Sequence, residues 1–418
     1  MSGLYGDPPA SPKRRTFLKR VLQGSAVLST APGLVTSASA APSAATAAAI
    51  KQYKPLGSTD MRIADISFGS SRLRDDSKLV QHAFERGINY FDTAESYTGG
   101  VSEETLGHAL RGKRDKVYLA SKGAFYSGTR QQEMMQTLEG SLRRLRTDYI
   151  DVYFNHAVND LDRLQNPEFY AFTERAKQQG KIRYVGLSGH GGRLIACLDY
   201  AIASGQFDVM LVAYNFGQDP SFLQFFTRGF DFIAINQDLP RVLRKAKAAG
   251  MGVIAMKTLR GARLNNMEPY QQDGATFSQA AFRWVLSNPA VDALIVTMRD
   301  PEQVDEFVAA SGTTKVTRQD LRLLHRYVSL NDATYCRPLC DACEASCPEQ
   351  VQIADVLRHK MYFADYGAER MAMEEYATLT HNAAACLTCS HQRCLQACAY
   401  GLPIPQLTRQ AHQWLHWG

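Results

Sequence analysis

The feature that most constrains the fold is a repeat of short apolar segments separated by amphipathic segments, between residues 63 and 298. The apolar segments have the length and composition of strands, and the amphipathic segments those of helices. The eight expected strands are residues 63–69, 88–93, 116–122, 149–156, 182–188, 208–215, 252–257 and 293–298. Near-continuous apolar strands that alternate with helices predict a closed (β/α)8 TIM barrel. An open doubly wound sheet is the alternative, and it is disfavoured because no Gly-x-Gly-x-x-Gly follows the first strand.

Local signals place helices between these strands. Residues 102–112 predict a helix with Ser102 as its N-cap and Gly112 as its stop, and residues 168–180 predict one that ends at Gly180. Cys197 falls within another expected helix of the barrel, where a buried position in the core is the simplest interpretation.

The length of the chain exceeds what one barrel needs. An α/β barrel takes about 250 residues, whereas the chain has 418, which predicts a second, smaller domain. Hydrophobic content of 45% with 21% charged residues is typical of a soluble globular protein, and no apolar run reaches the ~18 residues of a membrane span. We expect an export signal at 1–40, a flexible leader at 41–50, the barrel at 51–325 and a small α-helical domain at 326–418.

The first forty residues have the pattern of a signal peptide. A basic start is followed by a weakly apolar stretch and by Ala38-Ser39-Ala40, an A-x-A cleavage site. The segment "RRTFLK" at 14–19 resembles the twin-arginine motif, which implies export of an already folded protein to the periplasm or beyond. Removal of this segment lowers the net charge from +6 to +2, which argues against nucleic acid as a partner. A cytoplasmic protein with a basic tail is the alternative.

Four ionisable residues fall at or just after the ends of neighbouring strands: Asp92, Tyr97, Lys122 and His156. Barrel enzymes place their chemistry at these ends, although each residue alone could be an ordinary rim or core side chain. A lysine beside a tyrosine is expected to lower the tyrosine pKa from its usual value near 10. In such a set Asp92 would hold Lys122, His156 would orient a carbonyl oxygen, and Tyr97 would act as general acid.

These motifs resemble the aldo/keto reductases. The similar segments are "FDTAESYTGGVSEETLG" (91–107), "DYIDVYFNH" (148–156), "IRYVGLSGH" (182–190) and "LIVTMRDPEQVDEF" (294–307). The resemblance covers about residues 51–312. It implies a catalytic tetrad of Asp92, Tyr97, Lys122 and His156, a small carbonyl or alcohol substrate, and NADP(H).

The resemblance also implies residues that bind NADP(H). Ser188 matches the contact to the nicotinamide amide, and Arg299 and Gln303 match the phosphate-binding segment. The tyrosine that usually stacks on the nicotinamide is replaced by Met256, which is followed by Lys257. The cofactor residues are therefore Ser188, Lys257, Arg299 and Gln303, with Arg299 as the phosphate partner.

Eight of the nine cysteines lie in the last quarter of the chain, in two runs: Cys336, Cys340, Cys343, Cys347 and Cys386, Cys389, Cys394, Cys398. Four disulfides are one hypothesis for an exported chain. However, cysteines that are this close in the chain rarely have the geometry that a disulfide requires. Zinc is another, but zinc sites usually pair two couplets across a longer gap. Each run places four thiolates within about a dozen residues, and the first run ends in Cys-Pro. This pattern favours two 4Fe-4S clusters.

The tail resembles the helical ferredoxin-like domain of some aldo/keto reductases. In two-cluster ferredoxins the remote cysteine of each run binds the other cluster, so the division of the cysteines between clusters stays open. The segment between the runs, residues 351–379, is predicted to be helical.

These observations predict an exported oxidoreductase that acts on a small carbonyl or alcohol and exchanges electrons with a partner protein through its clusters. An electron-transfer or scaffold protein on a catalytically retired barrel is the alternative.

Overall fold

The computed structural model describes residues 48–191, 193–218, 238–259, 267–271, 276–332, 336, 342–364, 369–398 and 401–417. The expected export signal and most of the expected leader lie outside these ranges. Within them, no helix combines the length and the apolar character that a membrane span requires.

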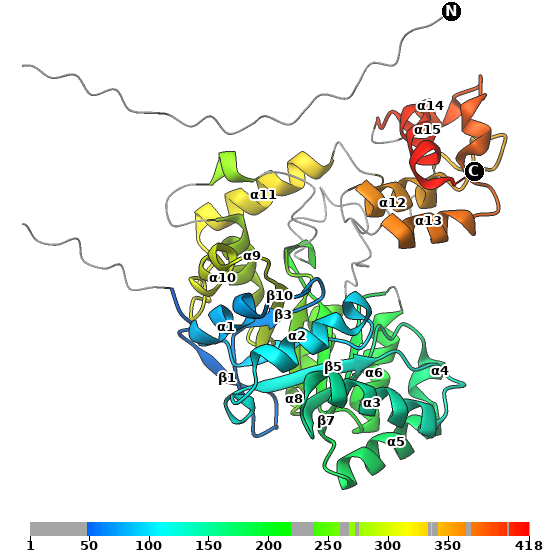
Figure 1. Cartoon of the computed structure of the whole chain (residues 1–418). Helices are drawn as coiled ribbons and strands as arrows, with labels where there is room; N and C mark the ends of the chain where they lie inside the picture. Colours follow the sequence, from blue (N-terminus) through cyan, green and yellow to red (C-terminus); the bar gives the residue numbers. More distant parts are fainter. Residues whose placement is uncertain are drawn as a thin grey trace, which may run out of the picture. The chain divides into compact units, whose positions relative to one another are not determined.

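Eight parallel strands form a closed barrel (Figure 1). They are β3 (Ile66–Gly69), β4 (Tyr90–Asp92), β5 (Tyr118–Gly123), β6 (Ile150–Asn155), β7 (Ile182–Gly189), β8 (Val209–Ala213), β9 (Gly252–Met256) and β10 (Ala293–Thr297). The last strand pairs with the first through Leu294 and Ile66, which closes the sheet. All eight predicted strands are confirmed, and the open sheet is excluded.

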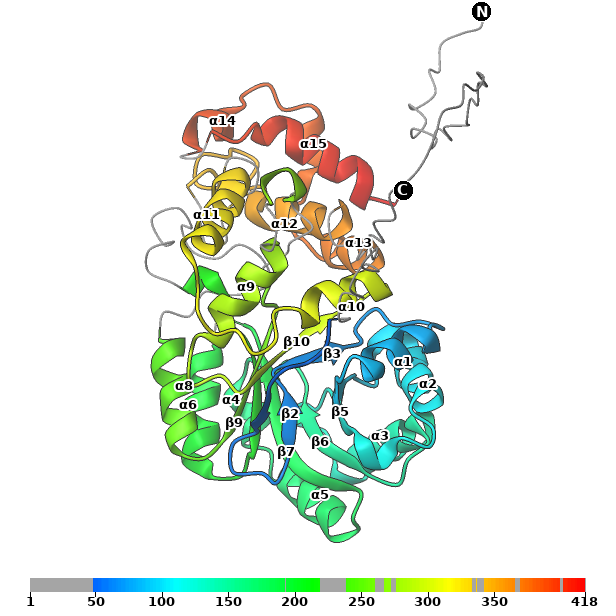
Figure 2. The same ribbon diagram turned by 90° about the vertical axis from the view of Figure 1, so that its left-hand side faces the viewer.

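Helices cover the outside of the barrel (Figure 2). They are α1 (Ser77–Glu85), α2 (Val101–Ala109), α3 (Gln131–Leu145), α4 (Leu161–Leu164), α5 (Pro167–Gln178), α6 (Leu194–Ser204), α8 (Leu239–Ala248), α9 (Phe277–Leu286) and α10 (Pro301–Val308). Helix α11 (Arg318–Asp332) packs against α9. Short 3-10 turns are η1 (Tyr97–Gly100), η2 (Arg114–Lys116), η3 (Phe216–Gln218) and η4 (Glu268–Tyr270). Cys197 on α6 is fully buried, which confirms its place in the core.

An antiparallel hairpin, β1 (Tyr53–Pro55) and β2 (Arg62–Ala64), closes one end of the barrel. Leu56 and Met61 are fully buried in the same apolar cluster as the side chains of the barrel interior. Ser58 N–H donates to the carbonyl of Gly250, two residues before β9 begins. The hairpin therefore covers the amino ends of the strands, which leaves the carboxyl ends for a functional site.

The C-terminal segment is helical. Its elements are α12 (Ile353–Ala364), α13 (Glu369–Ala377), η5 (Ala383–Leu387), α14 (Arg393–Ala397) and α15 (Ile404–Leu415). Helix α12 packs against α13 and α15, and α15 packs against η5. Their contacts bury Val356, Tyr376 and Leu415 in one apolar cluster. The predicted helical segment 351–379 is confirmed as α12 and α13.

The expected domain boundary between residues 325 and 326 falls inside α11. This helix is held to α9 by Arg283, whose guanidinium bonds both carboxylate oxygens of Asp320.

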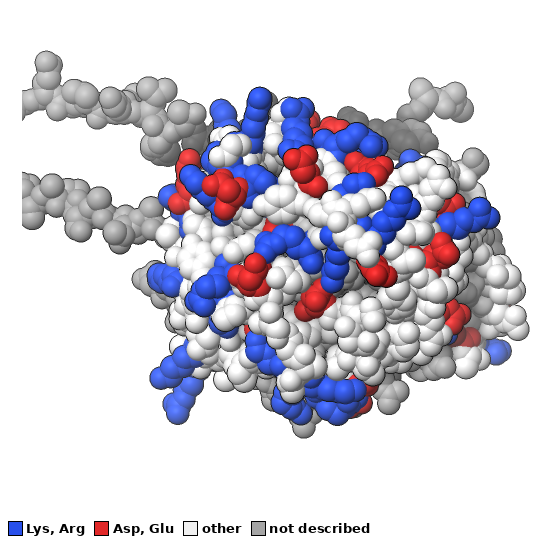
Figure 3. Space-filling view, turned by 90° about the horizontal axis from the view of Figure 1, so that it is seen from below, with Lys and Arg blue, Asp and Glu red and all other residues white. Residues whose placement is uncertain are grey.

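Lysines and arginines are interspersed with aspartates and glutamates on the face seen in Figure 3. That face carries no extended patch of one sign, as the small net charge of the chain predicts.

Candidate active site

Three adjacent strands bring the predicted catalytic residues to the open end of the barrel. Asp92 is the last residue of β4, Lys122 lies near the end of β5, and His156 directly follows β6. Tyr97 begins η1, the turn after β4. Because β4 pairs with β5 and β5 with β6, the carboxyl ends of these strands are neighbours.

Lys122 and Asp92 form a buried ion pair. Lys122 Nζ lies 2.6 Å from Asp92 Oδ1 and 2.6 Å from the carbonyl of Thr93. Both side chains are 1% exposed. Burial raises the pKa of Asp92, and the charge of Lys122 opposes this. Burial lowers the pKa of Lys122, but Asp92 and Tyr97 outweigh it, so the net pKa lies above its usual value. Lys122 is therefore an ammonium fixed inside the barrel.

The ammonium of Lys122 lies 5.0 Å from the centre of the Tyr97 ring. Burial raises the pKa of Tyr97, and Lys122 lowers it by a smaller amount. The prediction that the Tyr97 pKa lies below its usual value is therefore wrong. Desolvation of the phenolate raises the pKa by more than the attraction to Lys122 lowers it. Tyr97 keeps its proton at neutral pH, as a proton donor must.

His156 lies edge-on to Tyr97, with ring centres 5.7 Å apart and planes at 77°. Burial, followed by the positive charge of Lys122, lowers the pKa of His156 to about 3. Smaller contributions come from His190 and Lys257. The imidazole is therefore neutral at physiological pH and carries one N–H donor.

Arg163 on α4 braces the segment around His156, and the sequence analysis did not identify it. Its guanidinium donates to the carbonyls of Phe125 and His156 at 2.7 Å each, and to Asn155 Oδ1 at 2.9 Å. A third carbonyl, that of Ala157, accepts at 3.0 Å. These bonds fix the backbone that positions the imidazole. No local sequence pattern indicates them, because the partners come from two different loops.

Two of the predicted cofactor residues lie toward the same end of the barrel. Ser188, near the end of β7, accepts a hydrogen bond at its Oγ from the backbone N–H of Ala157, 3.0 Å away. Lys257 follows β9 in a left-handed conformation with φ of 55°. Its charge contributes to the low pKa of His156, so the two side chains interact.

The other two predicted cofactor residues lie at the start of α10. Arg299 N–H donates to Gln303 Oε1 at 3.0 Å, and Asp300 caps the helix through Gln303 N–H. Arg72, in the loop after β3, has a pKa lowered by burial and by the charge of Arg299. Two guanidiniums thus lie near each other where β3 and β10 end. Sequence reasoning missed Arg72, because its proximity to Arg299 depends on closure of the barrel.

The structure describes seven of the eight clustered cysteines, and Cys340 lies outside the described residues. Cys343 is 5% exposed, whereas Cys336 and Cys398 are half-buried beside the same apolar cluster. Cys347, Cys386, Cys389, Cys394 and Cys398 are present as thiols rather than disulfides.

Four thiols from the two runs interact with one another. Burial raises the pKa of Cys394, and the neighbouring thiols of Cys386, Cys347 and Cys389 raise it further. Burial also raises the pKa of Cys386, on which Cys347 and Cys389 act in the same way. Within the described ranges, no three acidic, histidine or cysteine side chains converge as they would on a single metal ion. A cubane differs in this respect, because each thiolate binds a different iron atom and the thiolates lie further apart.

A (β/α)8 barrel with ionisable side chains at the carboxyl ends of its strands is typical of an enzyme that transfers protons. Comparison with known proteins gives the class. The model of the aldo/keto reductase family matches residues 65–272. The barrel is therefore similar to the aldo/keto reductases over these residues, and the chain is an oxidoreductase of this type.

Relatives in other organisms are consistent with this assignment. An uncharacterized oxidoreductase of Bacillus subtilis, YqkF, is 26% identical and aligns over 66% of this chain and 95% of its own length. An L-galactose dehydrogenase of Arabidopsis thaliana is 25% identical, over 62% of this chain and 88% of its own. Among solved structures, an aldo-keto reductase from Bacillus halodurans in its holo form has a TM-score of 0.52 and 21% identity, and covers 66% of this chain and 95% of its own. The last likeness concerns the fold alone.

Proposed function

We propose that the barrel reduces the carbonyl group of a small substrate with NADPH, or oxidises the corresponding alcohol with NADP⁺. The observation that carries this proposal is the Tyr97 phenol, which keeps its proton and lies beside the buried ammonium of Lys122, 5.0 Å from the centre of the tyrosine ring. This pair suits the donation of a proton to an oxygen that gains negative charge.

Each residue of the site has a defined task in this proposal. The neutral imidazole of His156 and the hydroxyl of Tyr97 bind the carbonyl oxygen. Tyr97 gives its proton to that oxygen, and Lys122 stabilises the phenolate that remains. Asp92 keeps Lys122 charged and in place. NADPH, when bound, supplies the hydride that the carbonyl carbon accepts, so that proton and hydride together give the alcohol.

The residues around the barrel mouth fit an anionic cofactor. Arg299, with Arg72 beside it, offers positive charge for a phosphate. Gln303 lies next to Arg299, while Ser188 and Lys257 lie on the side of His156. In this proposal Arg299 and Arg72 hold a phosphate of NADP(H), and Ser188 holds the nicotinamide amide.

We also propose that the cysteines hold two 4Fe-4S clusters, which would supply one-electron transfer to a partner protein. The interaction of Cys347 with Cys386, Cys389 and Cys394 supports one of these sites. In this proposal the last cysteine of the first run belongs to the cluster of the second run. The second cluster would then fall to Cys336, Cys340, Cys343 and Cys398.

Purification of the full chain under anaerobic conditions tests both cofactor assignments. Iron, acid-labile sulfide, zinc and nicotinamide are measured on one sample. The proposal predicts about eight iron and eight sulfide per chain, together with saturable binding of NADPH. Zinc without sulfide would contradict the cluster assignment, and clusters without any affinity for NADPH would contradict the nicotinamide assignment.

Export of the folded protein through a twin-arginine signal in residues 1–40 is part of the same proposal, because clusters assembled before export require transport in the folded state. A reporter fused after residue 45 should leave the cytoplasm, and replacement of Arg14 and Arg15 by lysine should stop it. Export that is insensitive to this change would contradict the twin-arginine interpretation.

A further inference from the structure

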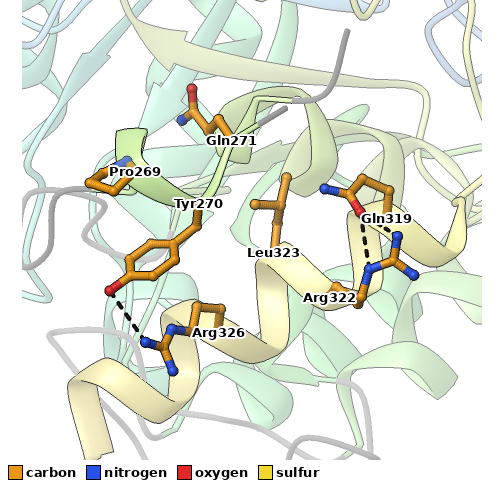
Figure 4. Close-up of a pocket in the computed structure, with 7 residues that line it drawn as sticks. All are labelled: Pro269, Tyr270, Gln271, Gln319, Arg322, Leu323 and Arg326. Atoms are coloured by element: carbon orange, nitrogen blue, oxygen red, sulfur yellow. Dashed lines mark hydrogen bonds between the residues drawn. The ribbon is translucent and has the colours of Figure 1, made fainter. Parts of the chain in front are cut away.

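A second concave site lies between η4 and α11, and none of the residues discussed so far as cofactor or catalytic groups lines it (Figure 4). Its volume is about 380 Å³, within the range of small-molecule sites. Tyr270 of η4 forms one wall, and Gln319, Arg322, Leu323 and Arg326 of α11 form the opposite side.

The helix that carries most of this pocket is firmly held. Asp320, which is fully buried, forms two bonds with Arg283 of α9: Oδ1 to Nη2 at 2.5 Å and Oδ2 to Nε at 3.1 Å. Leu323 is 2% exposed and belongs to an apolar cluster with Phe277 and Tyr327. The pocket is therefore built on a fixed element rather than on a loop, and its side chains start from defined backbone positions.

The polar groups of the pocket are rich in donors and positive charge. Arg322 Nε donates to Gln319 Oε1 at 3.0 Å, and its Nη2 bonds the same oxygen. Arg326 Nη2 donates to the hydroxyl of Tyr270 at 3.3 Å, and its guanidinium lies 4.6 Å from the centre of that ring. Among the described residues, no carboxylate lines the pocket and neither arginine forms an ion pair.

Of the three side-chain amide and hydroxyl acceptors in the lining, Gln319 Oε1 and Tyr270 Oη are already engaged by the arginines, and Gln271 Oε1 is the third. Most of the groups that remain toward a ligand are N–H and O–H donors, and with two positive charges they suit an anion rather than a cation. Arginine pairs of this kind bind carboxylate or phosphate. A phosphate monoester has a charge of about −1.5 to −2 at pH 7, so it matches two guanidiniums better than a carboxylate does. The ring of Tyr270 offers an apolar surface for the rest of the molecule.

We propose that this pocket binds a small organic phosphate monoester, with the phosphate on Arg322 and Arg326 and the organic group against the ring of Tyr270. The proposal does not depend on NADP(H) binding or on the clusters, because it rests on residues of η4 and α11 alone.

Calorimetric titration of the full chain with phenyl phosphate tests the proposal. Saturable binding should weaken at least about tenfold in the Arg322→Gln/Arg326→Gln variant, since a lost charge-assisted hydrogen bond corresponds to about that factor or more. Arg318→Gln, an exposed arginine of the same helix outside the pocket, is the matched control and should bind as the wild type does. Arg299→Gln should also leave binding unchanged, which separates this site from the proposed NADP(H) site.

A second variant and a second ligand make the result decisive. Arg322→Lys/Arg326→Lys keeps the charges and should retain part of the affinity, and thermal melts establish that each variant is folded. Benzoate should bind more weakly than phenyl phosphate. Absence of saturable phenyl phosphate binding, equal binding by the glutamine double variant, loss of binding in Arg299→Gln, or a preference for benzoate would each overturn the proposal.

Discussion

Protonation at the barrel mouth depends on how deeply each side chain is buried. Tyr97 holds its proton more tightly than a free tyrosine, because burial exceeds the effect of Lys122. His156 stays neutral, because burial and Lys122 lower its pKa to about 3. The donor and the orienting group therefore both have the protonation state that carbonyl reduction needs at neutral pH.

The pH dependence of reduction follows from these two shifts. Tyr97 must be protonated, and its pKa lies above the usual value near 10, so activity should fall only at the alkaline extreme. His156 must be neutral, and it becomes charged only near pH 3. Rates of NADPH oxidation at saturating carbonyl substrate should therefore agree within about twofold between pH 5 and 9. An acid limb centred near pH 6.5 that disappears in His156→Gln would contradict this expectation.

Removal of one partner of the buried ion pair should destabilise the barrel strongly. Lys122→Met leaves the carboxylate of Asp92 buried without its cation, and such losses typically cost about 3–5 kcal/mol. The double variant Asp92→Asn/Lys122→Met should lose less than Lys122→Met alone, because no unpaired charge remains. Urea unfolding measures the wild type and both variants, with exposed Lys116→Met as the control. A double variant less stable than Lys122→Met would contradict the expectation, because Asp92 would then stabilise the fold even without its cation.

At the scale of single elements, the strands were predictable and the ends of the helices were less so. Each strand is a short, nearly continuous apolar run, and this pattern is local. The predicted N-cap Ser102 is wrong, because α2 begins at Val101 after Gly100. The hydroxyl of Ser102 is fully buried and bonds Ser70 Oγ at 2.7 Å, a partner from another loop. A capping pattern cannot reveal that a tertiary contact has recruited the same side chain.

The loop after β6 depends on α4, and this gives a prediction at the same scale. Arg163→Lys keeps the charge, but its three donors share one nitrogen and cannot span the four acceptors that Nε, Nη1 and Nη2 reach, so the segment carrying His156 should loosen. We expect kcat to fall about tenfold, with little change in the unfolding midpoint of the variant. Exposed Arg175→Lys on α5 should behave as the wild type in steady-state kinetics. If kcat is unchanged while only stability falls, Arg163 has a structural role alone.

At the scale of the whole molecule, the sequence could bring together the four residues proposed as catalytic, because they follow strand ends and the barrel closes in a known way. It could not place Arg72 beside Arg299, since they are far apart in the chain and meet where β10 pairs with β3. The sequence also left open how the cysteines divide between the two proposed clusters. That grouping depends on the packing of α12, α13 and α15, which no local spacing specifies.

The cysteine grouping predicts which substitutions act on the same cluster. Cys347→Ser and Cys386→Ser, although in different runs, should each remove about four iron atoms, and the double variant should lose no more. Cys398→Ser combined with Cys386→Ser should instead lose about eight. Iron analysis with low-temperature paramagnetic resonance on reduced samples measures this. Additive loss of iron for Cys347 and Cys386 would place them on different clusters.

The most direct test of the central claim, carbonyl reduction at the Tyr97 site, is the rate of NADPH oxidation over a panel of small aldehydes and ketones. Wild-type protein is compared with Tyr97→Phe under anaerobic conditions, at equal iron content and equal thermal stability. We predict turnover by the wild type and a loss of about 10²–10⁴-fold in the variant, the usual contribution of a positioned proton donor. Equal rates for the two proteins would show that Tyr97 does not donate the proton and would contradict the proposed mechanism.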